Sequence, residues 1–172
     1  MAANAVVVGI VLGSASDWPD VEPAAIWLKD WGIGFEVTVA SAHRSPRRAQ
    51  AYAREAAGRG LKVLIAAAGA AAHLAGVLAA ETRLPVIGVP MPSSAFQGLD
   101  SLLATVQMPA GVPVATMALG AAGARNAAIF AAQILALTDP RLQQKLEEYK
   151  RELENSVIKQ MEKIPPEYRG KG

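Results

Sequence analysis

The feature that most constrains this chain is an alternation of short apolar runs with helix-like segments, repeated five times. The runs are rich in valine, isoleucine and alanine, as expected of strands covered on both faces. We expect strands over residues 6–12, 35–40, 62–66, 85–89 and 113–118. Parallel neighbours need long crossover connections, which helices supply. The pattern therefore predicts an α/β fold with a five-stranded parallel sheet between two layers of helices.

Helix start and stop signals lie between these runs. Pro19 and Pro46 suit the first turn of a helix, and Gly32 suits a helix end. We expect helices up to residue 30, from 46 to about 58–60, after 67–76, and over 99–107 and 122–137. The count predicts a flavodoxin-like three-layer α/β/α sandwich. In such sheets ligands bind outside the carboxyl ends of the strands, so the turns after the first three strands are the expected site.

A further helix follows the predicted sheet. Thr138 or Asp139 can cap it, and an apolar stripe then runs between charged residues: Leu142, Leu146, Tyr149, Leu153 and Val157. This helix is either a solvated appendage or a clamp on a neighbouring subunit, and the nearly all-apolar segment 122–137 favours the clamp. We expect one domain over 1–163, with an oligomerisation helix at about 140–163 and a flexible tail over 164–172.

Composition excludes several classes of protein. The formal net charge is only +2 and no Lys/Arg run stands out, so no nucleic-acid partner is expected. The chain has no cysteine, which excludes disulfides, a thiolate nucleophile and Cys-ligated zinc. The N-terminal residues lack the basic segment of a signal peptide, and Arg125 and Asn126 interrupt the longest apolar stretch. We expect a cytoplasmic protein without membrane contact.

The first turn, residues 13–17, reads Gly-Ser-Ala-Ser-Asp. Its backbone N–H groups and the Ser14 hydroxyl could hold a phosphate at a helix N-terminus, while the Asp17 carboxylate could accept from ribose hydroxyls. The alternative is that Ser16 or Asp17 is a plain N-cap. The spacing matches neither a dinucleotide-binding nor a P-loop signature, and no Gly-x-Ser-x-Gly elbow is present.

The second turn, residues 41–46, reads Ser-Ala-His-Arg-Ser-Pro. Arg44 could pair with the same phosphate and leave His43 free to move a proton. His73, in the third turn, is open to three interpretations: a packed, a capping or a catalytic residue. Two histidines on separate turns, without His-Glu-x-x-His spacing, predict no metal site.

Four segments together resemble the class I N5-carboxyaminoimidazole ribonucleotide mutases: 13–18, 41–46, Gly69 with 71–74, and 107–114. The likeness covers most of residues 6–155. It implies a flavodoxin-like homo-octamer whose C-terminal helix reaches over neighbouring subunits. It also implies a reaction without ATP, metal or organic cofactor, in which a carboxyl group moves from the exocyclic nitrogen of an aminoimidazole ribonucleotide to its ring carbon.

The resemblance also implies roles for individual residues. His43 matches the catalytic histidine, and Ser14, Asp17 and Arg44 match nucleotide-binding positions. The remaining expected substrate-binding residues are Ser16, Ser41, Gly69, Ala70, His73 and Leu74. If the carboxylate leaves as CO₂, the pocket must hold this gas while His43 carries the single proton that moves.

The third turn departs from the usual glycine-rich pattern of the family, with alanine at positions 67, 70 and 75. A methyl group at position 67 or 70 would cost on the order of 1 kcal/mol if the backbone there needs a positive φ. A divergent natural mutase is the leading hypothesis. The alternatives are an engineered or inactive oligomeric scaffold, a nucleotide-binding regulator, and a carboxylase that takes free CO₂, although the Arg-Ser pair typical of the last is missing.

Overall fold

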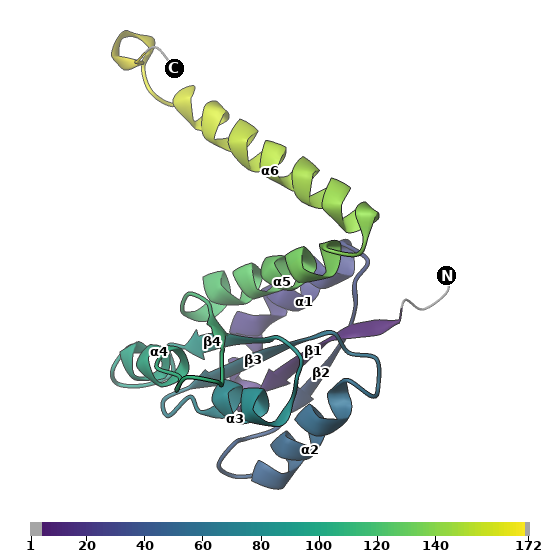
Figure 1. Cartoon of the computed structure of the whole chain (residues 1–172). Helices are drawn as coiled ribbons and strands as arrows, with labels where there is room; N and C mark the ends of the chain where they lie inside the picture. The colour runs from purple at the N-terminus through teal and green to yellow at the C-terminus, as the bar shows by residue number, and fades with distance from the viewer. Residues whose placement is uncertain (1–4, 171–172) are drawn as a thin grey trace. The chain divides into compact units, whose positions relative to one another are not determined.

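The computed structural model describes residues 5–170 and contains the expected alternation of strands and helices (Figure 1). The chain divides into two units, Met1–Ile134 and Leu135–Gly172. In chain order the elements are β1 Val6–Leu12, the short 3-10 turn η1 Ala15–Asp17, α1 Trp18–Asp30, β2 Gly34–Val39, α2 Pro46–Ala56, β3 Val63–Gly69, α3 Leu74–Glu81, β4 Val86–Met91, α4 Leu99–Val106, β5 Ala115–Thr116, α5 Gly120–Ala136, α6 Pro140–Met161 and η2 Pro166–Tyr168.

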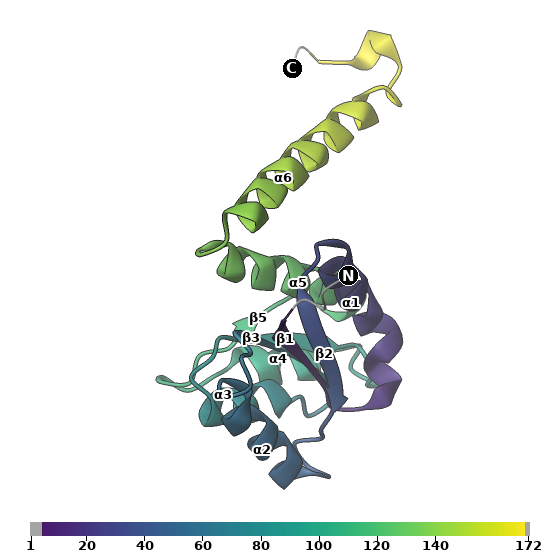
Figure 2. The ribbon, with the colours of Figure 1, turned by 90° about the vertical axis from the view of Figure 1, so that its right-hand side faces the viewer.

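The first unit is built on one parallel sheet. Its strand order is β2-β1-β3-β4-β5, and every neighbouring pair is parallel. Helices α1 and α5 cover one face, and α2, α3 and α4 lie on the other (Figures 1 and 2). The predicted α/β class and flavodoxin-like arrangement are therefore confirmed.

The core consists of the central strands and of small side chains on the helices that cover them. In β1 and β3, side chains such as Ile10 and Leu64 are completely buried. On α2 the buried face is made of alanines, including Ala49 and Ala53, which have no exposed surface. Small side chains allow a helix backbone to approach its neighbours closely, which explains how an alanine-rich chain can pack with few aromatic residues.

Two strands run further than predicted. β3 continues to Gly69, so residues 67–69 belong to the strand and not to the turn, and β4 continues to Met91 through Pro90. Alanine and glycine have low strand propensity, but pairing between β3 and β4 over these residues outweighs it. β5 pairs with β4 only as far as Gly88, so Pro90 has a strand neighbour on one side only, where proline is tolerated.

The fifth strand is shorter than predicted. Only Ala115 and Thr116 pair with β4, whereas we expected a strand over 113–118. Pro113 cannot donate to the ladder, and the chain already enters α5 at Gly120, so little length is left for pairing. The ends of α4 and α5 differ from the expected ranges by one or two residues.

The second unit contains α6 and η2. Of the two predicted caps of α6, Thr138 and Asp139, the structure has Asp139, whose side chain accepts a hydrogen bond from the Arg141 backbone N–H at 3.0 Å. Leu153 and Val157 of the predicted apolar stripe are exposed in this chain. The expected tail over 164–172 includes η2, and residues 171–172, like 1–4, lie outside the described residues. Within 5–170, no helix is both long and apolar enough to span a membrane.

Candidate active site

Backbone hydrogen bonds tie the first three connections together at the carboxyl edge of the sheet. Gly13 N donates to the Ala67 carbonyl at 2.8 Å, and Ala40 N donates to the Leu12 carbonyl at 2.9 Å. The register places Leu12 opposite both Val39 and Ala67. The connections that follow β1, β2 and β3 therefore begin at the same level, as the parallel topology predicts.

The first connection presents two hydroxyls and a buried carboxyl group. The Ser14 hydroxyl accepts from Ser16 Oγ at 2.8 Å and from Ser16 N at 3.3 Å. Asp17 precedes α1 at the N-cap position, but its side chain makes no capping hydrogen bond. Burial raises the pKa of the Asp17 carboxyl; a hydrogen bond from the Ser14 backbone opposes this, and nearby Asp20 adds to it.

The second connection is held rigid by reciprocal hydrogen bonds. Ser41 N donates to Ser45 Oγ at 2.9 Å, and Ser45 N donates to the Ser41 carbonyl at 3.0 Å. Arg44 N donates to Ser41 Oγ at 3.1 Å. The Arg44 guanidinium reaches toward the first connection, where it donates to the Gly13 carbonyl at 3.4 Å. The turn thereby directs the permanently charged guanidinium of Arg44 toward the connection that carries the Ser14 and Ser16 hydroxyls.

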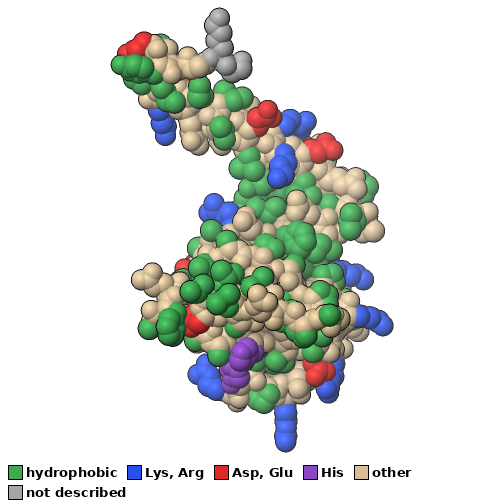
Figure 3. Space-filling view, turned by 60° about the vertical axis from the view of Figure 1, so that its left-hand side comes forward, with side chains coloured by type: hydrophobic (Ala, Val, Ile, Leu, Met, Phe, Trp, Pro, Cys, Tyr) green, Lys and Arg blue, Asp and Glu red, His purple; other side chains and the backbone are tan. Residues whose placement is uncertain are grey.

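The two histidines of the chain form a pair. His43 Nε2 and His73 Nδ1 lie 2.9 Å apart, within hydrogen-bond distance, and the rings are nearly perpendicular. His73 occupies the N-cap position of α3, but its side chain makes no capping hydrogen bond, so neither the packed nor the capping interpretation describes it. Both side chains are exposed in this chain, and Figure 3 shows histidine at the surface. In a neutral pair one ring donates the shared proton and the other accepts it.

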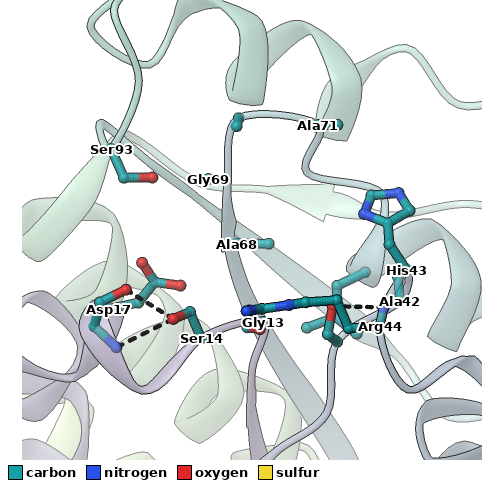
Figure 4. A pocket seen from close by; sticks show the side chains of 14 residues that line it. Gly13, Ser14, Asp17, Ala42, His43, Arg44, Ala68, Gly69, Ala71 and Ser93 are labelled. Carbon is teal, nitrogen blue, oxygen red and sulfur yellow. Dashed lines mark hydrogen bonds between the residues drawn. The ribbon is translucent and has the colours of Figure 1, made fainter.

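These groups surround one cavity of about 400 Å³ (Figure 4). All the predicted site residues except His73 line it, and His73 is joined to it through His43. The predicted residues at its wall are Ser14, Ser16, Asp17, Ser41, His43, Arg44, Gly69, Ala70 and Leu74. His73 does not line this cavity because its ring lies against that of His43, and its role in substrate binding stays a prediction.

The third connection carries a strained backbone. Ala70 has a φ of +50°, in the left-handed region that favours glycine, whereas Ala67 is not among the described non-glycine residues with positive φ. Of these two positions, only Ala70 therefore carries the free-energy cost of a side chain at positive φ. Backbone strain of this kind gathers at functional sites in many proteins.

The sequence analysis missed Ser93, the polar residue that the β4–α4 connection adds to the cavity wall. The predicted site comprised only the turns after the first three strands, whereas the carboxyl end of β4 lies at the same edge of the parallel sheet. Ser93 could have been predicted from the rule that ligands bind at the carboxyl ends of parallel strands. Within the described part of the chain, no group of three or more histidine or acidic side chains is placed to hold a metal ion.

Comparison with known proteins gives consistent results. The family model described as AIR carboxylase matches residues 7–156. The N5-carboxyaminoimidazole ribonucleotide mutase of Pseudomonas aeruginosa is 51% identical over 152 residues, which are 88% of this chain and 93% of that protein. The mutase of the same name from Thermotoga maritima is 48% identical over 157 residues, 91% of each chain.

Among solved structures, PurE from Treponema denticola superposes with a TM-score of 0.81 at 28% identity, covering 92% of this chain and 98% of that one. The sequence match with the family spans every residue of the sheet except Val6 and every connection that builds the cavity. This chain belongs to the AIR carboxylase family.

Proposed function

We propose that this chain is an N5-carboxyaminoimidazole ribonucleotide mutase, which forms 4-carboxy-5-aminoimidazole ribonucleotide in purine synthesis. The observation that carries the proposal is a cavity with His43 at one side and Ser14 and Asp17 at the other (Figure 4), where His43 is also paired with His73. A volume of about 400 Å³ falls in the range of small-molecule sites. The relatives of this name, which are 51% and 48% identical to this chain in sequence, support the proposal.

The cavity has groups for each part of a ribonucleotide. Arg44 and the hydroxyls of Ser14 and Ser16 suit the phosphate, because a guanidinium and hydroxyl donors complement its charged oxygens. The Asp17 carboxylate suits the ribose, since it can accept from hydroxyls and would repel the phosphate. The aminoimidazole ring then lies toward His43.

The reaction needs the movement of one carboxyl group and one proton. The bond between nitrogen and the carboxylate breaks, CO₂ leaves, and the electron pair remains on the nitrogen, which takes a proton. The ring carbon then attacks the retained CO₂ and loses its own proton. The sum is an isomerisation in which a proton passes from the ring carbon to the nitrogen, and His43 gives and then recovers this proton.

His73 is the proposed partner of His43 in this transfer. The hydrogen bond between the rings fixes the orientation of His43 and offers a basic nitrogen next to it. A charge that develops on the His43 ring is shared with its neighbour. A free imidazole on a mobile side chain would have neither advantage.

The mechanism requires a closed pocket, whereas both histidines are exposed in the single chain. Escape of CO₂ or entry of water would abort the reaction. Exposed apolar side chains on α4, among them Leu99, Leu103 and Val106, support cover by other subunits, as do those of Leu153 and Val157 on α6. A homo-octamer, a cytoplasmic location and catalysis without a cofactor belong to this proposal.

The direct test supplies N5-carboxyaminoimidazole ribonucleotide without ATP and follows the ultraviolet change of ring carboxylation. The wild-type protein should exceed the spontaneous rate, and His43→Asn should lower kcat by at least about 100-fold, the usual contribution of a general acid–base group. His73→Asn should lower kcat less, because His43 remains. Calorimetry with the product should show that His43→Asn still binds the nucleotide.

The same assay and calorimetry, repeated with other nucleotides, separate the alternatives. Faster turnover of aminoimidazole ribonucleotide with bicarbonate than of the N-carboxylated substrate would identify a carboxylase that uses free CO₂. A stable oligomer that neither binds nor converts either nucleotide would identify a scaffold. Comparable binding of adenine nucleotides would identify a regulator.

A further inference from the structure

Ser93 brings a fourth connection to the cavity. β3 and β4 are paired so that Gly69 lies opposite Met91, which places the residues after Met91 beside the third connection. Ser93 lines the cavity, and its hydroxyl oxygen points toward Gly69 (Figure 4). Among the described residues it has no hydrogen-bond partner, although the Ser94 and Ser101 hydroxyls nearby are both hydrogen-bonded.

Gly69 makes this approach possible. A Cβ atom at position 69 would overlap Ser93 Oγ and would lie only 3.1 Å from Ser93 Cβ. Any side chain at position 69 would therefore force the Ser93 hydroxyl out of its present position. Because Gly69 has no side chain, the Ser93 hydroxyl can lie directly against it.

The loop that carries Ser93 is braced independently of that hydroxyl. Ser94 Oγ donates to Asp100 Oδ1 at 2.7 Å and accepts from Phe96 N at 3.1 Å. Ser101 Oγ donates to the Met91 carbonyl at 2.9 Å, at the end of β4. The backbone on both sides of Ser93 is thus braced by hydrogen bonds that do not use its hydroxyl, which leaves that hydroxyl available to a ligand.

We propose that Ser93 is a further substrate-binding residue, whose hydroxyl hydrogen-bonds a ribose hydroxyl of the ribonucleotide. The inference rests on the proposed function. Ser93 lies on the Asp17 side of the cavity, away from His43, so its partner is the sugar and not the reacting ring (Figure 4). A serine hydroxyl both donates and accepts, and it therefore complements a carboxylate that can only accept from the sugar.

Kinetics of Ser93→Ala, together with calorimetry of product binding, test the assignment. Loss of one hydrogen bond should raise KM and the product Kd by about three- to tenfold. The value of kcat should stay within about twofold, because a contact to a non-reacting part stabilises ground state and transition state alike. The thermal unfolding midpoint should not change, since no described group depends on the hydroxyl. Ser94→Ala, the matched control, should lower that midpoint, because its hydroxyl braces the loop.

Gly69→Ala provides a second route to the same contact. Its Cβ would displace Ser93 Oγ, so it should weaken binding strongly in the wild-type background and less in the Ser93→Ala background. Unchanged KM and Kd in Ser93→Ala overturn the inference while leaving the mutase proposal intact. A loss confined to kcat overturns the assignment to the sugar. A wild-type protein that neither binds nor converts the nucleotide refutes the proposed function, and this inference with it.

Discussion

Replacement of Ala70 by glycine should stabilise the protein. Ala70 has a φ of +50°, and a left-handed backbone costs a residue with a Cβ atom roughly 1–2 kcal/mol. Glycine removes that cost, but it also adds about 0.4–1 kcal/mol of conformational freedom to the unfolded chain. The difference predicts that Ala70→Gly raises the free energy of unfolding by roughly 0.5–1 kcal/mol per subunit.

The local geometry supports assigning this gain to the backbone. Ala70 is exposed, so its methyl group contributes little to the core. Its carbonyl accepts a hydrogen bond from Ala72 N at 2.8 Å, and the Ala71 carbonyl accepts from His73 N at 2.8 Å. These bonds fix the turn that leads to the histidine pair, and glycine can make them equally well.

The assay is thermal and urea unfolding at one fixed protein concentration, because assembly couples to stability. For a chain of this size the gain corresponds to a rise in the unfolding midpoint of roughly 1–4 °C. Ala71→Gly is the matched control: the same substitution at the next residue, which is exposed and has no positive φ. It should lower stability by about 0.4–1 kcal/mol. If both variants lose stability equally, Ala70 stores no strain and the reasoning is refuted.

Three further predictions concern the core and two carboxyl groups. Leu64→Ala, at a fully buried position in β3, should cost about 2–5 kcal/mol in urea unfolding, and a loss below about 1 kcal/mol would contradict the packing described. Burial raises the pKa of Glu36, but hydrogen bonds from Arg59 and Tyr52 outweigh it and hold the pKa below its ordinary value of 4.5. The charged carboxylate therefore stabilises the fold above pH 4.5, and the loss of unfolding free energy caused by Glu36→Gln should shrink as the pH falls below 4.5. A difference in stability between the two proteins that does not change with pH would argue against the ion pair. Burial raises the pKa of Asp17 instead, so its charge opposes folding at neutral pH: Asp17→Asn should unfold at a higher temperature yet bind the ribonucleotide more weakly by calorimetry, and a lower unfolding temperature would show that burial is not the dominant influence.

Much of the fold follows from local pattern and from the rules for parallel sheets. The residues of β1 are the predicted ones, because valine and isoleucine favour strands and Gly13 ends the run. The convergence of Ser14, His43 and Gly69 at one edge required only the topology, since parallel strands end on the same side of the sheet. Roles for these residues remain proposals, supported by the family and by their place in the cavity.

Other features depend on contacts that a sequence pattern does not contain. The extension of β3 to Gly69 comes from pairing with β4, which overrides the weak strand propensity of alanine and glycine. The orientation of His73 depends on the direction in which α3 leaves the strained turn before it. The position of His73 at the start of a helix therefore did not predict its hydrogen bond to His43. The topology could have indicated Ser93, because the carboxyl end of β4 lies at the same edge of the sheet, but the close approach of its hydroxyl to Gly69 could not be predicted from the sequence.

The three alanines that depart from the family pattern, at positions 67, 70 and 75, are not equivalent. Ala67 lies within β3, where its carbonyl accepts from Gly13 N, so its methyl group imposes no left-handed strain. Ala75 is buried in the first turn of α3 and packs close to Gly88 of β4, at a position where proline would also be tolerated. Only Ala70 combines a costly backbone with a place in the cavity wall. Any effect of these alanines on catalysis should therefore be reversed by glycine at position 70, and not by changes at positions 67 or 75.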